Sequence, residues 1–254
     1  MRSLLAFAVA VAFAAPIAAA AADAPAPVKP IRHLVYDVSY SAYSTHQAKS
    51  SGFNGAYGGG SPSAGSPSGG TGTLSQAMNG DERGLLTIDV IAAPADGGLV
   101  VDTTFTGPTN AQPTTRVAIY KDGRITADPT HPLAPATTRL LPLIARGFIA
   151  ERDVSAGSSW VVPAPAPAKG STTYRVESSD GHLARIAIEG TWTVSGPAGF
   201  DEADQGVTTY ATDLVSPVSY DLIARIHRQF GTDSSLTTNA HLTAKLITDS
   251  LAKT

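Results

Sequence analysis

The sequence contains no cysteine and few charged residues. Cysteine is absent from all 254 residues, and Asp, Glu, Lys and Arg together make up 15% of them. The absence of cysteine excludes a disulfide framework, a zinc–thiolate site and a lipid anchor on a cysteine side chain. The 18 basic and 21 acidic residues give a net charge of −3 without a run of either sign. We therefore expect neither a nucleic-acid-binding stripe nor a basic membrane-surface helix.

The sequence also lacks the motifs of common active sites. It has no G-x-S-x-G elbow, no S-x-x-K set with partners, no HExxH pair and no glycine-rich phosphate loop ahead of a helix. Asp102 begins a stretch that looks like an aspartic-protease loop, but Thr104 stands where that loop needs glycine. His227 and His241 fall on the polar face of a predicted hairpin, and we interpret them as solvated rather than metal-bound. We predict no catalytic residue, no metal site and no cofactor.

The first 22 residues have the features of a secretory signal peptide. Arg2 supplies a basic start, residues 4–17 form an apolar run, and residues 20–22 are three alanines suited to cleavage. The apolar run is shorter than the ~20 residues that a membrane span needs. We therefore expect export to the periplasm or the exterior, with no transmembrane segment left after cleavage.

The rest of the chain reads as one β domain. Residues 23–30 form an Ala/Pro leader, alternation of apolar and polar residues begins at Ile31, and we predict a single β domain over residues 31–254. Residues 51–72 are mostly glycine and serine, so we expect a flexible loop between two strands, with a flap over a binding face as the alternative. Residues 137–151 have helical spacing interrupted by proline and glycine, which predicts one short or broken helix.

Same-face pairing predicts the hairpins. In TTYRVESSDGHLARIAIEGTWTV, residues 172–194, the predicted pairs are Val176 with Ala184, Tyr174 with Ile186 and Arg175 with Arg185, and Glu177 lies diagonal to Arg185. In the last hairpin the predicted pairs are Phe230 with Leu236, Leu222 with Ala244, Tyr220 with Leu246, Asp221 with Lys245 and His227 with Asn239. The same parity predicts a two-residue turn at Asp96-Gly97 and a three-residue turn at residues 121–123.

These elements predict a strongly curved sheet. Residues 216–230 would extend ~50 Å as a strand, whereas a compact chain of this size is about 45 Å across. We count about ten strands, nearly all with one apolar face, and a single short helix to cover them. The fold class is therefore mainly β, a curved antiparallel meander that forms a half-barrel or a barrel.

The excess of apolar sheet face over cover predicts an apolar hollow. Its candidate lining residues are Tyr174, Ile186, Ile188, Trp192, Leu222, Ile226, Leu242 and Leu246. The expected ligand is an apolar small molecule or a lipid.

A signal peptide, a cysteine-free mature chain, long meandering strands and a short helical plug resemble the bacterial periplasmic lipoprotein-carrier half-barrels. Gly-Ser-Ser-Trp at residues 157–160, ahead of a run of hairpins, is similar to a stretch in exported bacterial all-β proteins. The likeness spans most of residues 31–251 as a pattern, without a motif that matches residue by residue. It implies apolar-ligand binding by analogy of fold.

Three functional interpretations follow from the sequence. The leading one is an exported, non-enzymatic protein that binds a lipid-like or other apolar molecule in the concave face of its sheet. The alternative is a structural or protein-interaction module of the bacterial envelope, with a fully packed core and no ligand. The third is an enzyme whose site is scattered over loops.

Overall fold

The computed structural model describes residues 29–49, 73–128, 130, 133–149, 152–164, 166–196, 199–231 and 234–251. The predicted signal peptide, the predicted loop at residues 51–72 and most of the Ala/Pro leader lie outside these residues and stay predictions. Among the described residues, no helix is both long and apolar enough to cross a bilayer.

The described chain forms one antiparallel sheet of eleven strands, which confirms the predicted fold class with one strand more than expected. The strands are β1 (Arg32–Lys49), β2 (Thr73–Ala92), β3 (Leu99–Thr106), β4 (Thr115–Ile119), β5 (Ile125–Ala127), β6 (Ser159–Pro163), β7 (Lys169–Ser179), β8 (Leu183–Val194), β9 (Phe200–Ala211), β10 (Ser216–Phe230) and β11 (Ser234–Asp249). Three short helical turns follow β5, namely α1 (Pro135–Leu140), η1 (Leu141–Ile144) and η2 (Arg146–Phe148).

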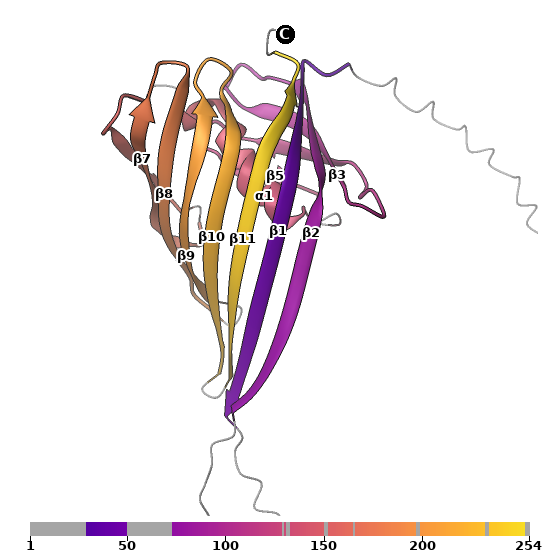
Figure 1. The fold of residues 1–254 in the computed structure, drawn as a ribbon, viewed down its shortest axis with the longest axis vertical. Coiled ribbons are helices and arrows are strands. Elements are labelled where there is room, and N and C mark those ends of the chain that lie inside the picture. Colours follow the sequence, from indigo (N-terminus) through magenta and orange to yellow (C-terminus); the bar gives the residue numbers. More distant parts are fainter. Residues whose placement is uncertain are drawn as a thin grey trace, which may run out of the picture.

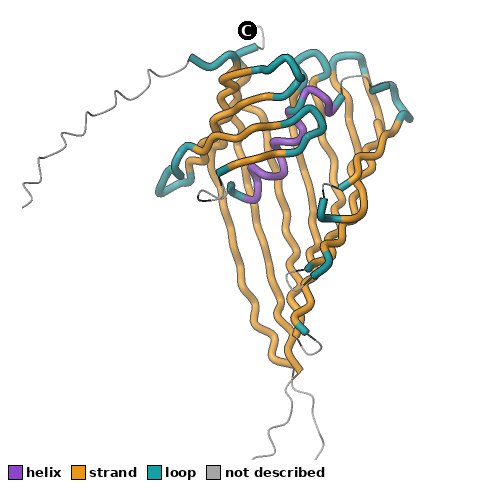
Figure 2. Tube along the Cα trace, turned by 180° about the vertical axis from the view of Figure 1, so that it is seen from behind, coloured by secondary structure: helices purple, strands orange, loops and turns teal. Residues whose placement is uncertain are grey.

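The sheet is a meander in which β1 pairs with β11. The strand order is β5-β4-β3-β2-β1-β11-β10-β9-β8-β7-β6, so β5 and β6 are free edges and the sheet does not close. Arg32 near the start of β1 makes two hydrogen bonds to the carboxylate of Asp249 at the end of β11. The sheet curls around the three helical turns, which lie on its concave side (Figure 2).

The three helical turns, residues 135–148, are called the helical segment below. Apolar residues of this segment are buried: Leu140, Leu141 and Ile144 are at most 2% exposed. The ring of Phe148 packs against Tyr174, Tyr210 and Trp160, with centroids 5.0 to 5.7 Å apart. The Tyr210 hydroxyl donates a hydrogen bond to the Leu143 carbonyl at 2.8 Å. The helical segment therefore fills the upper part of the concave face.

The molecule is elongated. β1 and β2 contain 18 and 20 residues, and β10 and β11 contain 15 and 16. At ~3.3 Å per residue, β2 extends about 66 Å. These four strands continue past the helical segment and converge at the lower end (Figure 1). The long strand at residues 216–230 therefore fits because the molecule is elongated and because the sheet is curved.

The register of the last hairpin differs from the predicted one by two residues. Phe230 pairs with Ser234 instead of Leu236. Gly231, directly after Phe230, has a φ of +66°, a left-handed conformation that glycine adopts without strain. A shift of two keeps every side chain on its predicted face, so apolar alternation did not exclude it.

The shifted register also changes the polar pairs. Asp221 lies opposite Thr243 rather than Lys245, and its carboxylate interacts with His241 Nε2 at 2.8 Å. The remaining predicted pairs shift in the same way: Leu222 pairs with Leu242, Tyr220 with Ala244 and His227 with Thr237. The described residues contain no group of three or more His, Asp or Glu side chains placed to hold a metal ion.

A bulge displaces the β7–β8 hairpin from its predicted register. The pairing shifts between Val176 and Ser178, so Glu177 is the extra residue. The resulting pairs are Val176 with Ile186, Tyr174 with Ile188 and Arg175 with Ala187. The expected contact between Glu177 and Arg185 is present, with Arg185 Nε donating to Glu177 at 2.8 Å.

The two remaining turns had different outcomes. Ile119 pairs with Ile125, which confirms the three-residue turn at residues 121–123. The prediction of a two-residue turn at Asp96-Gly97 was wrong, because β2 ends at Ala92 and β3 begins at Leu99. A bulge between Val90 and Ala92 changes the parity on which that turn was predicted.

Candidate ligand site on the concave face

A row of small residues crosses the concave face below the helical segment. Consecutive neighbours in this row, from β2 to β8, are Gly80, Ala42, Ala240, Ala224, Asp204 and Gly190. Ala224 and Ala240 are at most 5% exposed. Because five of the six residues have no side chain beyond Cβ, the sheet occupies little of the concave space at this level. We call these six residues the small-residue row.

A buried ionic cluster lies where the helical segment meets this row. Arg139 of α1 donates from Nη1 to Asp204 Oδ2 at 2.8 Å and from Nη2 to Glu202 Oε1. The side chains of Arg139, Glu202 and Asp204 are 18%, 6% and 6% exposed. These contacts tie the helical segment to β9. We call the three residues the Arg139 cluster.

Gly190 makes room for the side chains of Asp204 and Thr172. A Cβ at Gly190 would lie 3.4 Å from Asp204 Cβ and 3.0 Å from Thr172 Oγ1. Thr172 Oγ1 accepts a hydrogen bond from Trp192 Nε1 at 3.1 Å. The absence of a side chain at residue 190 therefore lets Asp204 and Thr172 lean over β8 from its two neighbouring strands.

Two carboxylate oxygens near the cluster have no hydrogen-bond partner in the described residues. They are Asp204 Oδ1 and Glu82 Oε2, and both atoms are buried. Glu82 lies opposite Tyr40 on the neighbouring strand. Burial raises the pKa of Tyr40, while the charge of Arg139 lowers it and the charges of Glu82 and Glu202 raise it. The charge of Glu82 therefore affects the pKa of the Tyr40 hydroxyl, as do the charges of Arg139 and Glu202.

Burial raises the pKa of Asp204 from its ordinary value of 3.8 to about 7. The charge of Arg139 opposes this shift, whereas the charge of Glu202 and a hydrogen bond shared with it add to the shift. The two carboxyl groups are most stable with one proton between them, because two adjacent buried negative charges repel each other. That proton gives Asp204 a hydrogen bond to donate to Glu202.

We expect this proton to make folding stability depend on pH. A carboxyl group with a raised pKa in the folded state contributes most below pH 3.8, and its contribution falls as the pH rises through about 7. The free energy of unfolding of Asp204→Asn should therefore change less with pH than that of the wild type. Between about pH 4 and about pH 8, this change should be smaller by a few kcal/mol. Urea denaturation at several pH values measures the difference. Parallel curves for the variant and the wild type would contradict the assignment.

The structure divides the eight predicted lining residues into two groups. The residues buried in the core are Ile186, Ile188, Leu222 and Leu242. The partly exposed residues are Tyr174, Trp192, Ile226 and Leu246. Of these four, Tyr174 and Leu246 pack against the core, while Trp192 and Ile226 flank Glu202 in one row. Trp192 and Ile226 are thus the predicted lining residues that lie past the small-residue row.

Sequence patterns alone did not predict the Arg139 cluster. A signal for it exists in β9, where Glu202 and Asp204 have the same parity as the buried Thr208 and Tyr210. Carboxylates at inward positions of a strand need a buried partner. Nothing local identifies Arg139 as that partner, because it is more than 60 residues away in the chain.

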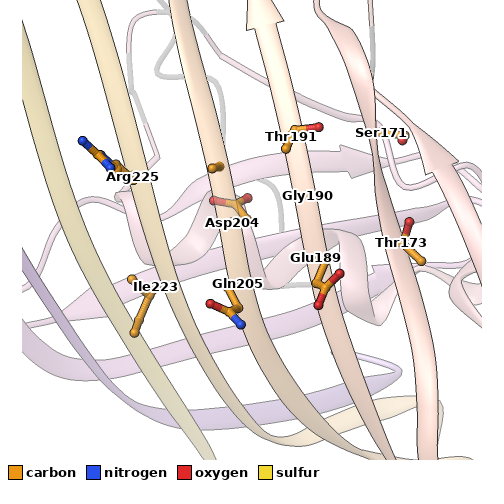
Figure 3. A pocket seen from close by; sticks show the side chains of 10 residues that line it. Ser171, Thr173, Glu189, Gly190, Thr191, Asp204, Gln205, Ile223 and Arg225 are labelled. Carbon is orange, nitrogen blue, oxygen red and sulfur yellow. The ribbon is translucent and has the colours of Figure 1, made fainter.

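The outer face of the sheet carries a separate hollow of about 510 Å³ (Figure 3). It is lined by Ser171, Thr173, Glu189, Gly190, Thr191, Ala203, Asp204, Gln205, Ile223 and Arg225. Most of these side chains are polar and stand on the odd-numbered, outward positions of β7 to β10. The exceptions are the apolar Ala203 and Ile223, of which Ile223 is 56% exposed, and Gly190 and Asp204 at even-numbered positions. This polar surface does not suit an apolar ligand.

Comparisons with known proteins assign no family. No family model and no curated protein matches the sequence. A solved structure described as "Lipid-protein interactions in lipovitellin" is similar over 90% of this chain, with 10% sequence identity and a TM-score of 0.42. The chain spans 26% of the length of that structure. A likeness at this level carries no argument about function. An argument about function therefore rests on the open eleven-stranded sheet and its concave face.

Proposed function

We propose that the protein is exported and binds a lipid-like or other apolar molecule on the concave face of its sheet, without catalysing a reaction. One observation carries the proposal. The helical segment fills only the upper part of the concave face, while β1, β2, β10 and β11 continue past it (Figures 1 and 2). Trp192 of β8 and Ile226 of β10, which flank Glu202 past the small-residue row, stay partly exposed.

The energetics favour an apolar occupant. Burial of apolar surface contributes roughly 25 cal/mol per Å², so a ligand that covers Ile226 and Trp192 gains affinity in proportion to the area covered. The small-residue row lies beside these two side chains and, apart from Asp204, adds no side-chain atoms beyond Cβ. Pockets for small apolar molecules combine such apolar walls with a few polar groups, here those of the Arg139 cluster.

A matched pair of variants on β10 tests the proposal. Ile226 shares a face with the buried Leu222 and Ala224, whereas Ile223 points outward and is 56% exposed. Ile226→Glu should weaken binding of dodecanol or palmitate about tenfold or more, because a carboxylate replaces apolar contact. Ile223→Glu should leave binding unchanged. The readout is the change in tryptophan fluorescence on titration, with Trp192→Phe to identify the reporting residue.

The same titration separates this function from the alternative of an envelope interaction module with a filled core. A saturable change that Ile226→Glu weakens and Ile223→Glu does not supports ligand binding. No saturable change with any apolar compound, or equal loss in both variants, would remove the proposal in favour of the filled core.

A further inference from the structure

We propose that the bound molecule is a fatty-acid-like amphiphile, whose carboxylate pairs with Arg228 near the lower end of β10 while its alkyl chain lies over Ile226 and Trp192. This inference rests on the proposed function and names the chemical class of its ligand.

Arg228 stands on the inward face of the sheet, next to the apolar side chains of the proposed site. The pairing of β10 with β11 runs without a register shift over residues 219–230, so Arg228 lies on the same face as Ile226 and the buried Leu222. Arg228 follows Ile226 by two residues, which is about 7 Å along the strand. The headgroup of a ligand whose chain covers Ile226 can therefore reach the guanidinium.

The guanidinium of Arg228 has no counter-ion in the described part of the chain. Its side chain is exposed, and its guanidinium carbon lies 5.5 Å from the centroid of the Phe200 ring. Glu202, which lies opposite Ile226, already accepts a hydrogen bond from Arg139. The guanidinium of Arg228 is therefore open to a ligand, whereas that of Arg139 is not.

The apolar neighbours of Arg228 make its charge selective. Leu236, its partner on β11, is partly exposed, as is Phe200, and Phe230 is 46% exposed. Water solvates the guanidinium while the site is empty, but an alkyl chain that covers these side chains also removes part of that water. A charge that loses water is stable only beside an opposite charge. An anionic headgroup is therefore favoured over an alcohol, and an ammonium headgroup is repelled.

A carboxylate suits this single guanidinium better than a phosphate does. Arginine pairs with a carboxylate through two parallel hydrogen bonds, and the one negative charge of the carboxylate balances its one positive charge. A phosphate monoester carries a charge of about −1.5 to −2 at neutral pH. The excess negative charge would lie near Glu202, so the charge balance favours the carboxylate.

Four ligands of equal chain length test the inference: dodecanoate, dodecyl phosphate, dodecanol and dodecylamine, each titrated calorimetrically into the full chain at neutral pH. We expect dodecanoate to bind about fivefold more tightly than dodecanol, dodecyl phosphate to bind no more tightly than dodecanoate, and dodecylamine to bind most weakly.

A matched pair of variants on β10 identifies the residue responsible. Arg228→Gln should remove the preference for dodecanoate while the affinity for dodecanol stays within about twofold. Arg225→Gln removes the same charge from the outward face of the same strand and should leave the preference unchanged. Both arginine side chains are exposed, so neither substitution disturbs the core.

The outcomes distinguish the two levels of the proposal. Equal affinity for dodecanoate and dodecanol, or tighter binding of dodecylamine or dodecyl phosphate, overturns the carboxylate headgroup and leaves apolar binding in place. A preference for dodecanoate that survives Arg228→Gln, or that Arg225→Gln reduces equally, also overturns it. No binding of any of the four compounds overturns the proposed function and this inference together.

Discussion

Replacing Arg139 by methionine is expected to lower the free energy of unfolding by about 3–5 kcal/mol. The substitution keeps the length of the side chain but removes both hydrogen bonds to Glu202 and Asp204. Two carboxylates whose side chains are 6% exposed would then lack their cation. The helical segment would also lose its ionic contact with β9. Urea denaturation at neutral pH measures the loss.

An exposed pair of the same kind provides the control for this prediction. Arg116 makes two hydrogen bonds to Asp102 at 2.8 and 2.9 Å, but its side chain is 62% exposed. Solvent screening makes such surface pairs contribute little. Arg116→Met should therefore barely change stability. If the two methionine variants unfold at the same denaturant concentration, the Arg139 cluster is not the structural link that its burial indicates.

Replacing Gly206 by alanine is expected to destabilise the fold by about 3 kcal/mol. A Cβ at this position would lie 2.3 Å from the carbonyl oxygen of Asp221 and 2.9 Å from the Cα of Leu222. These are backbone atoms of the neighbouring strand β10, so neither moves without disturbing the pairing that carries Ile226. The residue must be glycine because β9 and β10 approach closely at this point.

Gly80→Ala is the matched control, because no atom lies within 4 Å of a Cβ at that position in β2. This variant should fold with unchanged or slightly increased stability, since alanine reduces the entropy of the unfolded chain. Thermal unfolding followed by circular dichroism compares the two variants. Equal melting temperatures would show that the approach of β10 to Gly206 does not constrain the fold.

Much of the sheet was predictable because side chains in strands alternate. The period of two identified β10 over residues 216–230 with the bounds that the structure has. It also placed residues 121–123 in a three-residue turn. The same period explains the errors in register. A shift by two residues keeps Phe230 and Leu222 on their predicted faces, so alternation does not decide between the predicted and the observed pairing.

The candidate site was predictable only in its apolar part. Trp192 and Ile226 follow from alternation along β8 and β10. The Arg139 cluster joins a helix to a strand that follows four strands later in the chain, and no local pattern encodes that contact. The small-residue row likewise depends on the pairing of β1 with β11, whose partners are nearly 200 residues apart. Tertiary structure therefore had to supply the polar half of the site.

The most direct test of the central claim is photo-crosslinking with a dodecanol derivative that carries a diazirine on its alkyl chain, followed by mass spectrometry at residue resolution. The concave-face site predicts labelling at Ile226 and Trp192 that excess unlabelled dodecanol suppresses. Labelling confined to outward residues such as Ile223, or labelling that the competitor does not reduce, would contradict it.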